Sequence, residues 1–207
     1  MAIRAVLTGD IVNSTRIGKA NERKLLKSLQ QVLAAHLFEF YRGDSLQVYL
    51  KEPRQALQMA LLCRTAGMSI TQDKIVAPSD VRVSIGIGQV NTSVKSLGNA
   101  KGEAFVLSGR AFDEKLHSDI RLVISTANPL ANAGLEVIAD YINAIFKVMT
   151  SKQAAVIFEL LKGETQQQVA AKMKKSKSTI NQRVSAGRWA EIEKLLKQYE
   201  NIINQLT

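Results

Sequence analysis

Two Gly-Asp pairs are the residues of this 207-residue chain whose types are best suited to chemistry. Asp44 ends an Arg-Gly-Asp turn between two alternating segments, which together predict a β-hairpin over 38–50. Asp10 follows a glycine at the end of an apolar segment that predicts a strand over 2–8. Two carboxylates at strand exits of one sheet are oxygen ligands for a divalent cation such as Mg²⁺ or Mn²⁺. The alternative is that both pairs are ordinary turn residues.

Strands and helices alternate through the part of the chain that positions these carboxylates. Besides the segments above, strands are predicted over 80–90 and 120–124, and helices over 20–36, 53–66, 103–117 and 129–146. In the third of these helices, four residues are expected to face the core: Phe105, Val106, Gly109 and Phe112. The order of elements predicts an α+β fold, in which helices back a mixed sheet.

Composition and charge limit the compartment and the partners. The net charge of +10 favours an anionic partner such as nucleic acid or a nucleotide. No uncharged apolar run of about 18 residues occurs, so no membrane-spanning segment is expected. The single cysteine, Cys63, cannot form an intramolecular disulfide, and the N-terminus lacks the layout of a signal peptide. A reducing cytoplasm is the predicted compartment.

The composition shifts after Thr150, where no strand pattern remains, and this predicts domains over 1–150 and 151–207. Two short predicted helices, over 166–173 and 177–184, are separated by a tight turn. A small residue in the first helix and apolar anchors in both are typical of a helix-turn-helix, whose second helix lies in the major groove of double-stranded DNA. The alternative is a solvated basic face on a small helical hairpin.

The polar residues of this all-α domain divide by the part of DNA that each can reach. Side chains suited to base edges are Ser178, Thr179, Asn181, Gln182 and Arg183. Cations expected at phosphates are Lys172, Lys174, Lys175, Lys177 and Arg188. The apolar stripe of the last predicted helix, over 188–206, indicates either packing on the N-terminal domain or a homodimer contact.

Four N-terminal segments resemble those of class III nucleotidyl cyclases, whose catalytic domains share a palm-like, ferredoxin-type fold. They are the two Gly-Asp segments, the Gly-Ile-Gly strand over 82–88, and the Gly-Glu-Ala-Phe segment that begins at Gly102. Combined with the C-terminal helix-turn-helix, they are similar to the bacterial SatD family over nearly the whole chain. The cyclase resemblance implies a bound nucleotide and a metal held by Asp10, Asp44 and the carbonyl of Ile11.

The same resemblance implies that Arg110 stabilises the transition state if the palm domain is active. Three positions depart from the cyclase pattern: Val106 replaces an asparagine, and Phe40 and Asn99 replace the base-selecting lysine and aspartate. Losing such preorganised contacts costs on the order of 100-fold in rate per group. The sequence therefore predicts a DNA-binding transcriptional regulator with a degenerate ligand- or metal-sensing palm. An active cyclase or related phosphoryl-transfer enzyme, and a palm that is only a dimerisation scaffold, remain as alternatives.

Overall fold

The structure is a computed structural model, and it describes residues 2–41, 43–70, 79–90, 93–116 and 120–206. The strands are β1 (Ala2–Val12), β2 (Leu37–Tyr41), β3 (Ser45–Leu50), β4 (Asp80–Val90) and β5 (Leu122–Thr126). A 3₁₀ turn, η1 (Pro53–Gln55), precedes α2. The helices are α1 (Lys19–Leu33), α2 (Ala56–Ile70), α3 (Glu103–Lys115), α4 (Pro129–Lys147), α5 (Ser151–Leu161), α6 (Gln166–Met173), α7 (Lys177–Ala186) and α8 (Trp189–Asn204). Arg42 of the predicted turn and the predicted helix end at 117 lie outside the described residues.

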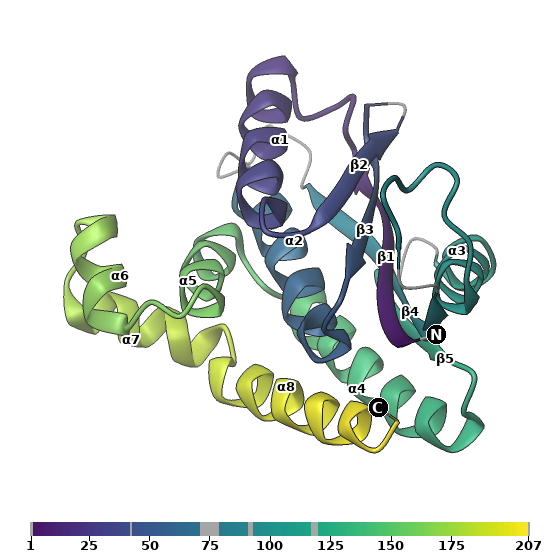
Figure 1. Cartoon of the computed structure of the whole chain (residues 1–207). Helices are drawn as coiled ribbons and strands as arrows, with labels where there is room; N and C mark the ends of the chain where they lie inside the picture. Colours follow the sequence, from purple (N-terminus) through teal and green to yellow (C-terminus); the bar gives the residue numbers. More distant parts are fainter. Residues whose placement is uncertain (1, 42, 71–78, 91–92, 117–119, 207) are drawn as a thin grey trace.

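The strands form one mixed sheet in the order β2-β3-β1-β4-β5. Neighbouring strands are antiparallel except β4 and β5, which are parallel. The first six elements run β-α-β-β-α-β, and β1 and β4 lie in the middle of the sheet. The predicted mixed α+β fold is confirmed. In Figure 1, α1 and α2 lie on one side of the sheet and α3 lies on the other.

The two faces of the sheet are packed differently. Alternate residues of β1, including Ala5 and Leu7, join the main core with α1, α2 and α4, whereas Val6 joins a small cluster under α3. The prediction for α3 was wrong at Val106, whose side chain is 49% exposed; the buried positions are Ala104, Ser108 and Ala111. These small residues face the sheet because α3 lies very close to Gly86 of β4, where an added Cβ would lie 2.2 Å from the Ala104 carbonyl oxygen. The α3 backbone comes so close to the glycine strand that only small side chains fit between them.

Gly9 and Asp10 do not end the first strand, so that part of the prediction was wrong. β1 continues to Val12, and Gly9 lies opposite both Val83 of β4 and Leu46 of β3. A Cβ at Gly9 would lie 2.7 Å from the Arg82 carbonyl oxygen, so this glycine permits close strand approach rather than a turn. The chain turns after Val12, where Asn13 has a φ of 59°.

The C-terminal helices share the main core with the sheet-backing helices. α5 packs on α2, and the amide of Gln58 donates to the carbonyl of Leu161 over 2.7 Å at the end of α5. α8 packs against α4, and its fully buried Tyr199 hydroxyl donates to the carbonyl of Pro53 over 2.8 Å. Of the two roles expected for the stripe over 188–206, packing on the N-terminal region is therefore what the structure shows. Figure 1 shows α6 and α7 at one end of the molecule, away from the sheet.

Within the described residues, every helix is too short or too polar to cross a bilayer.

Candidate functional site

The sheet brings the two predicted metal ligands together, although they are 34 positions apart in the chain. Asp10 lies directly opposite Ser45 in the β1–β3 pairing, so Asp44 is the neighbour of its cross-strand partner. The backbone of the third predicted ligand connects the two strands, because the amide of Ile11 donates to the carbonyl of Asp44 over 2.9 Å. Asp10 and Asp44 thus lie near the same end of adjacent strands, although Asp10 lies within β1 rather than at its exit.

Arg82 is the functional neighbour that the sequence reasoning missed. It lies opposite Asp10 on β4, and its Nε donates to Oδ1 of Asp10 over 2.8 Å while Nη2 contacts Oδ2. The hydrogen bond to Asp10 raises the pKa of Arg82. Its guanidinium also lies 5.9 Å from the centre of the Phe112 ring. Both oxygens of Asp10 therefore already accept from a cation.

This arrangement does not fit a divalent cation. Asp10 is neutralised by Arg82, and Oδ2 of Asp44 accepts from the hydroxyl of Ser14 over 3.0 Å. Among the residues that the structure describes, His, Cys, Asp and Glu form no group of three or more that could hold a metal. A metal bound by two carboxylates and one carbonyl would need Arg82 to leave Asp10 first. We therefore derive no metal-dependent step from these residues.

A row of polar side chains crosses the α3 face of the sheet, next to the two aspartates. Cross-strand pairing aligns four residues, one from each of β2, β3, β1 and β4: Glu39, Gln47, Thr8 and Ser84. The hydroxyls of Thr8 and Ser108 lie 3.0 Å apart, and the Ser84 hydroxyl donates to the Ser108 carbonyl over 2.6 Å. α3 is therefore fixed to the middle strands by hydrogen bonds.

At the β2 end of this row, Glu39 holds a loop on the sheet. Its Oε2 accepts from the hydroxyl of Tyr41 over 2.6 Å, and its Oε1 accepts from the amide of Leu97 over 2.9 Å. These bonds lower the pKa of Glu39, and burial together with Glu39 raises the pKa of Tyr41 to about 12. Both carboxylate oxygens of Glu39 are thus satisfied within the protein.

The other residues that the resemblance to nucleotidyl cyclases singled out lie apart from one another. Arg110 and Val106 are exposed on α3, and Asn99 is exposed in the loop before it. Phe40 packs against the main core, on the opposite face of the sheet from Asp10. Arg110 is therefore the one position of this group whose side chain is charged and exposed on the helix next to Asp10.

α6 and α7 are two short helices joined by a tight turn at the predicted position. Lys174 adopts the left-handed conformation, with φ 52° and ψ 48°, where a glycine is usual. The hydroxyl of Ser176 then caps α7 by accepting from the amide of Thr179 over 3.1 Å. Ile180 and Val184 of α7 are buried. Ser178, Asn181 and Gln182 are exposed, and Thr179 and Arg183 are half-buried.

The predicted phosphate-contacting cations separate into two groups. Lys172 forms an ion pair of 2.7 Å with Glu159 of α5, and the hydrogen bond to Glu159 raises the pKa of Lys172. Arg188 donates to Glu191 over 3.0 Å and to the hydroxyl of Tyr141 over 2.6 Å.

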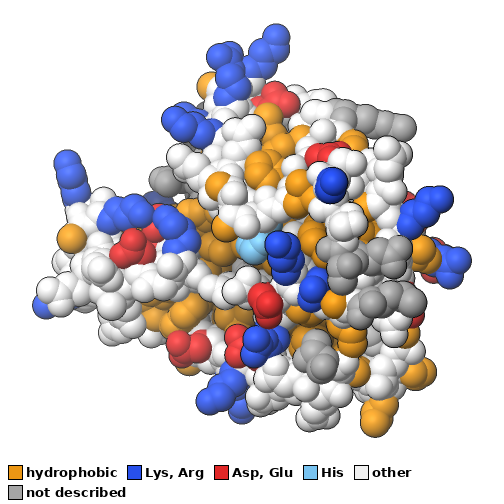
Figure 2. All heavy atoms as spheres, viewed as in Figure 1, with side chains coloured by type: hydrophobic (Ala, Val, Ile, Leu, Met, Phe, Trp, Pro, Cys, Tyr) orange, Lys and Arg blue, Asp and Glu red, His pale blue; other side chains and the backbone are white. Residues whose placement is uncertain are grey.

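The second group consists of Lys174, Lys175 and Lys177, which are exposed and form no ion pair with any described residue. In Figure 2, Lys and Arg side chains project from the part of the molecule that α6 and α7 form. These three cations remain available to a partner.

Comparison with known proteins gives only distant structural neighbours. No protein-family model and no curated protein matches the chain. One similar solved structure is a bacterial light-regulated adenylyl cyclase, with 11% identity, a TM-score of 0.38, and coverage of 65% of this chain and 78% of that one. A second structure of such a cyclase gives 10% identity and a TM-score of 0.37, covering 66% of this chain and 44% of that one. Similarities this distant assign no activity.

Proposed function

We propose that this chain is a DNA-binding transcriptional regulator that places α7 in the major groove of duplex DNA. The observation that carries the proposal is the exposed polar face of α7, presented by the turn at Lys174 and the cap at Ser176. Asn181 and Gln182 on that face have the amide groups that suit adenine. Residues 166–188 contain six Lys or Arg and no Asp or Glu, so the local field attracts phosphates.

In this proposal the N-terminal region is a degenerate, cyclase-like palm of the SatD type that binds a ligand without turning it over. The neutralisation of Asp10 by Arg82 supports a sensing role over a metal-dependent reaction. The regulator would act as a cytoplasmic homodimer, since dimers match two DNA half-sites. The exposed apolar side chains Leu130, Val137 and Val148, which are 83%, 68% and 76% exposed, give α4 and its end a surface for such a contact.

The DNA-binding proposal is tested with the full chain and a labelled duplex of mixed sequence at low salt. We expect the Lys175→Ala/Arg183→Ala variant to bind roughly 10-fold or more weakly than the wild type, because two cationic contacts are lost. The matched control is Arg23→Ala/Lys24→Ala, which removes the same charge from exposed positions of α1. Unchanged affinity in the first variant, or an equal loss in both, contradicts the proposal.

A second candidate function is metal-dependent nucleotidyl cyclisation or a related phosphoryl transfer, and the closeness of Asp10 and Asp44 favours it. The test supplies each nucleoside triphosphate with Mn²⁺ or Mg²⁺ and measures product. An enzyme forms product that Asp44→Asn abolishes, whereas a sensor is stabilised by a ligand without turnover. A palm that is only a scaffold shows neither product nor a change in melting temperature.

A further inference from the structure

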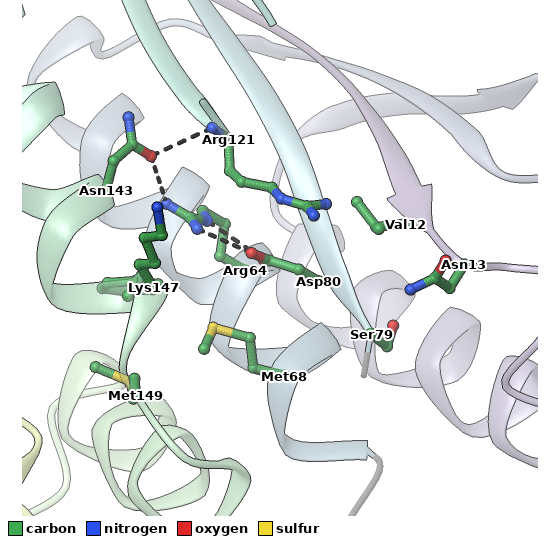
Figure 3. A pocket seen from close by; sticks show the side chains of 11 residues that line it. Val12, Asn13, Arg64, Met68, Ser79, Asp80, Arg121, Asn143, Lys147 and Met149 are labelled. Atoms are coloured by element: carbon green, nitrogen blue, oxygen red, sulfur yellow. Dashed lines mark hydrogen bonds and ion pairs between the residues drawn. The ribbon is translucent and has the colours of Figure 1, made fainter. Parts of the chain in front are cut away.

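A cavity of about 230 Å³ lies at the edge of the sheet where β1 ends and where β4 and β5 begin. The lining comes from these strands and from α2 and α4, as Figure 3 shows. Among the described residues that line it, the charged ones are the cations Arg64, Arg121 and Lys147 and the carboxylate Asp80. Because Arg64 is paired with Asp80, the guanidinium of Arg121 is a positive charge that makes the cavity a binding place for an anion rather than for a cation.

Arg64 forms the rigid wall of this cavity. Its side chain is 2% exposed, and it donates from Nη2 and Nε to the carboxylate of Asp80 over 2.8 and 3.3 Å. Its Nη1 donates to Oδ1 of Asn143 over 3.1 Å, and the guanidinium lies 4.6 Å from the centre of the Phe146 ring. A cation that is buried and held by three groups, the Asp80 carboxylate, the Asn143 amide and the Phe146 ring, keeps its position before any ligand arrives.

Two other polar groups of the lining lack partners among the described residues. The buried hydroxyl of Ser79 makes no hydrogen bond, although its residue is only 4% exposed. The guanidinium of Arg121 forms no ion pair or hydrogen bond with a described side chain, and in Figure 3 it extends across the cavity toward Val12 and Asn13. Burying a hydroxyl without a hydrogen bond costs free energy of folding. A ligand that accepts a hydrogen bond from this hydroxyl removes that cost and thereby binds more tightly.

We propose that this cavity binds a small phosphorylated molecule, whose phosphate pairs with Arg121 and accepts a hydrogen bond from Ser79. A guanidinium presents the planar donors that match phosphate oxygens, and the fixed charge of Arg64 adds to the attraction. The apolar part of such a ligand would contact Met68 and Met149. The cavity volume limits the ligand to a small metabolite rather than a dinucleotide.

The position of the cavity gives the ligand a route to the helix-turn-helix. Lys147 and Met149 line it, and Thr150 directly after them caps α5. Met68 of the lining comes from α2, the helix on which α5 packs. An occupant therefore contacts both elements that hold the first helix of the C-terminal region. This regulatory consequence rests on the proposed function, whereas binding of the phosphorylated molecule does not.

The proposal is tested by calorimetric titration of the full chain with inorganic phosphate, and separately with succinate as a dicarboxylate. We expect phosphate to bind the wild type and Arg23→Gln equally, and to bind Arg121→Gln at least about 10-fold more weakly. The Lys175→Ala/Arg183→Ala variant is expected to bind phosphate as the wild type does. No DNA is present, so failure of the DNA-binding proposal would leave this result unaffected.

Ser79→Ala separates a ligand contact from a structural role. Removing an unpaired buried hydroxyl leaves the melting temperature of the protein without phosphate unchanged or higher, whereas phosphate affinity falls several-fold. The proposal is overturned if phosphate does not bind, if Arg121→Gln binds it as the wild type does, or if succinate binds more tightly than phosphate. It is equally overturned if Ser79→Ala lowers the melting temperature without phosphate but leaves the affinity unchanged.

Discussion

Two cations of the sheet region and two cations of the turn between α6 and α7 are placed in opposite ways. In the sheet region, Arg82 is paired with Asp10, and Arg64 is paired with Asp80. In the turn before α7, Lys174 and Lys175 are exposed and have no ion-pair partner among the described residues. Paired cations that are buried or half-buried contribute to the folded structure, whereas unpaired exposed cations contribute little to it and are available to an anionic partner.

Lys172 lies between these two cases, because it belongs to α6 but is paired with Glu159 of α5. The side chain of Glu159 is 11% exposed and also pairs with Lys162 over 3.1 Å. Paired and unpaired cations therefore differ within the α6–α7 segment as well as between the two regions. Whether a cation is paired, rather than where it lies in the sequence, decides which role it has.

The largest expected effect is loss of stability on removing a paired cation from the sheet region. We expect Arg64→Ala to lower the free energy of unfolding by about 3–5 kcal/mol, because it leaves the Asp80 carboxylate, whose side chain is 15% exposed, without its partner. Denaturant unfolding measures this change. The matched control is Arg23→Ala on the exposed face of α1. Its free energy of unfolding is expected to lie within about 0.5 kcal/mol of that of the wild type. A loss below about 1 kcal/mol for Arg64→Ala would show that this pair is not structural.

The next effect compares a paired lysine of α6 with an unpaired lysine of the turn that follows it. Lys175→Ala should weaken duplex binding several-fold and reduce the slope of log affinity against log salt by about 0.9, with no change in stability. Lys172→Ala should leave the salt slope unchanged and cost at most about 1 kcal/mol of stability, since its side chain is 49% exposed. Equal salt slopes for the two variants would remove the distinction.

The third effect converts a paired carboxylate into an available one. Arg82→Gln frees Asp10, so we expect Mn²⁺ to raise the melting temperature of this variant but not that of the wild type. Manganese at ten times its dissociation constant would raise the free energy of unfolding by about 1.4 kcal/mol, which corresponds to a rise in melting temperature of roughly 3–5 °C. The shift should vanish in Arg82→Gln/Asp10→Asn. A shift of the same size in the wild type would instead support a working metal site.

The fourth effect concerns the backbone of the turn. Lys174→Gly should raise stability by about 0.5–1 kcal/mol, because glycine adopts the observed φ of 52° without strain. Lys175→Gly removes the same charge at a position without positive φ, and it should lower stability by a similar amount. Thermal melting of both variants provides the comparison. Destabilisation by Lys174→Gly would mean that the lysine side chain, not the turn, stabilises this corner.

Much of the framework could be predicted from local patterns. The alternation over 80–90 is β4 to the residue, and the hairpin over 38–50 is β2 and β3 with β2 starting one residue earlier. Helix positions were right because apolar spacing and Pro129 mark them locally, although α1 ends at Leu33 rather than at 36. The turn at Lys174 followed from helix-turn-helix spacing alone. Each of these features depends on neighbours in the chain.

The features that were missed depend on contacts between distant segments. The pairing of Arg82 with Asp10 requires the β1–β4 register, which no local pattern contains. The small inward face of α3 depends on Gly86 of another strand, so the apolar pattern pointed to Val106 instead. The role of α8 depended on its contacts with α4 and η1, which only the folded chain forms. Local patterns therefore located the aspartates but not the charge that neutralises one of them.

The smallest effect tests whether an internal hydrogen bond depends on ionisation. The bonds from Tyr41 and from the amide of Leu97 lower the pKa of Glu39 below its value in the unfolded chain. The contribution of ionised Glu39 to folding stability is therefore fully present above the pKa that Glu39 has in the unfolded chain. It is lost as the pH falls through the lower pKa that Glu39 has in the folded protein. We expect Glu39→Gln to melt slightly below the wild type at pH 7, and this difference to shrink as the solution is acidified below about pH 4. A difference that stays constant over that range would mean that Glu39 holds the loop by shape alone, not as a charged acceptor.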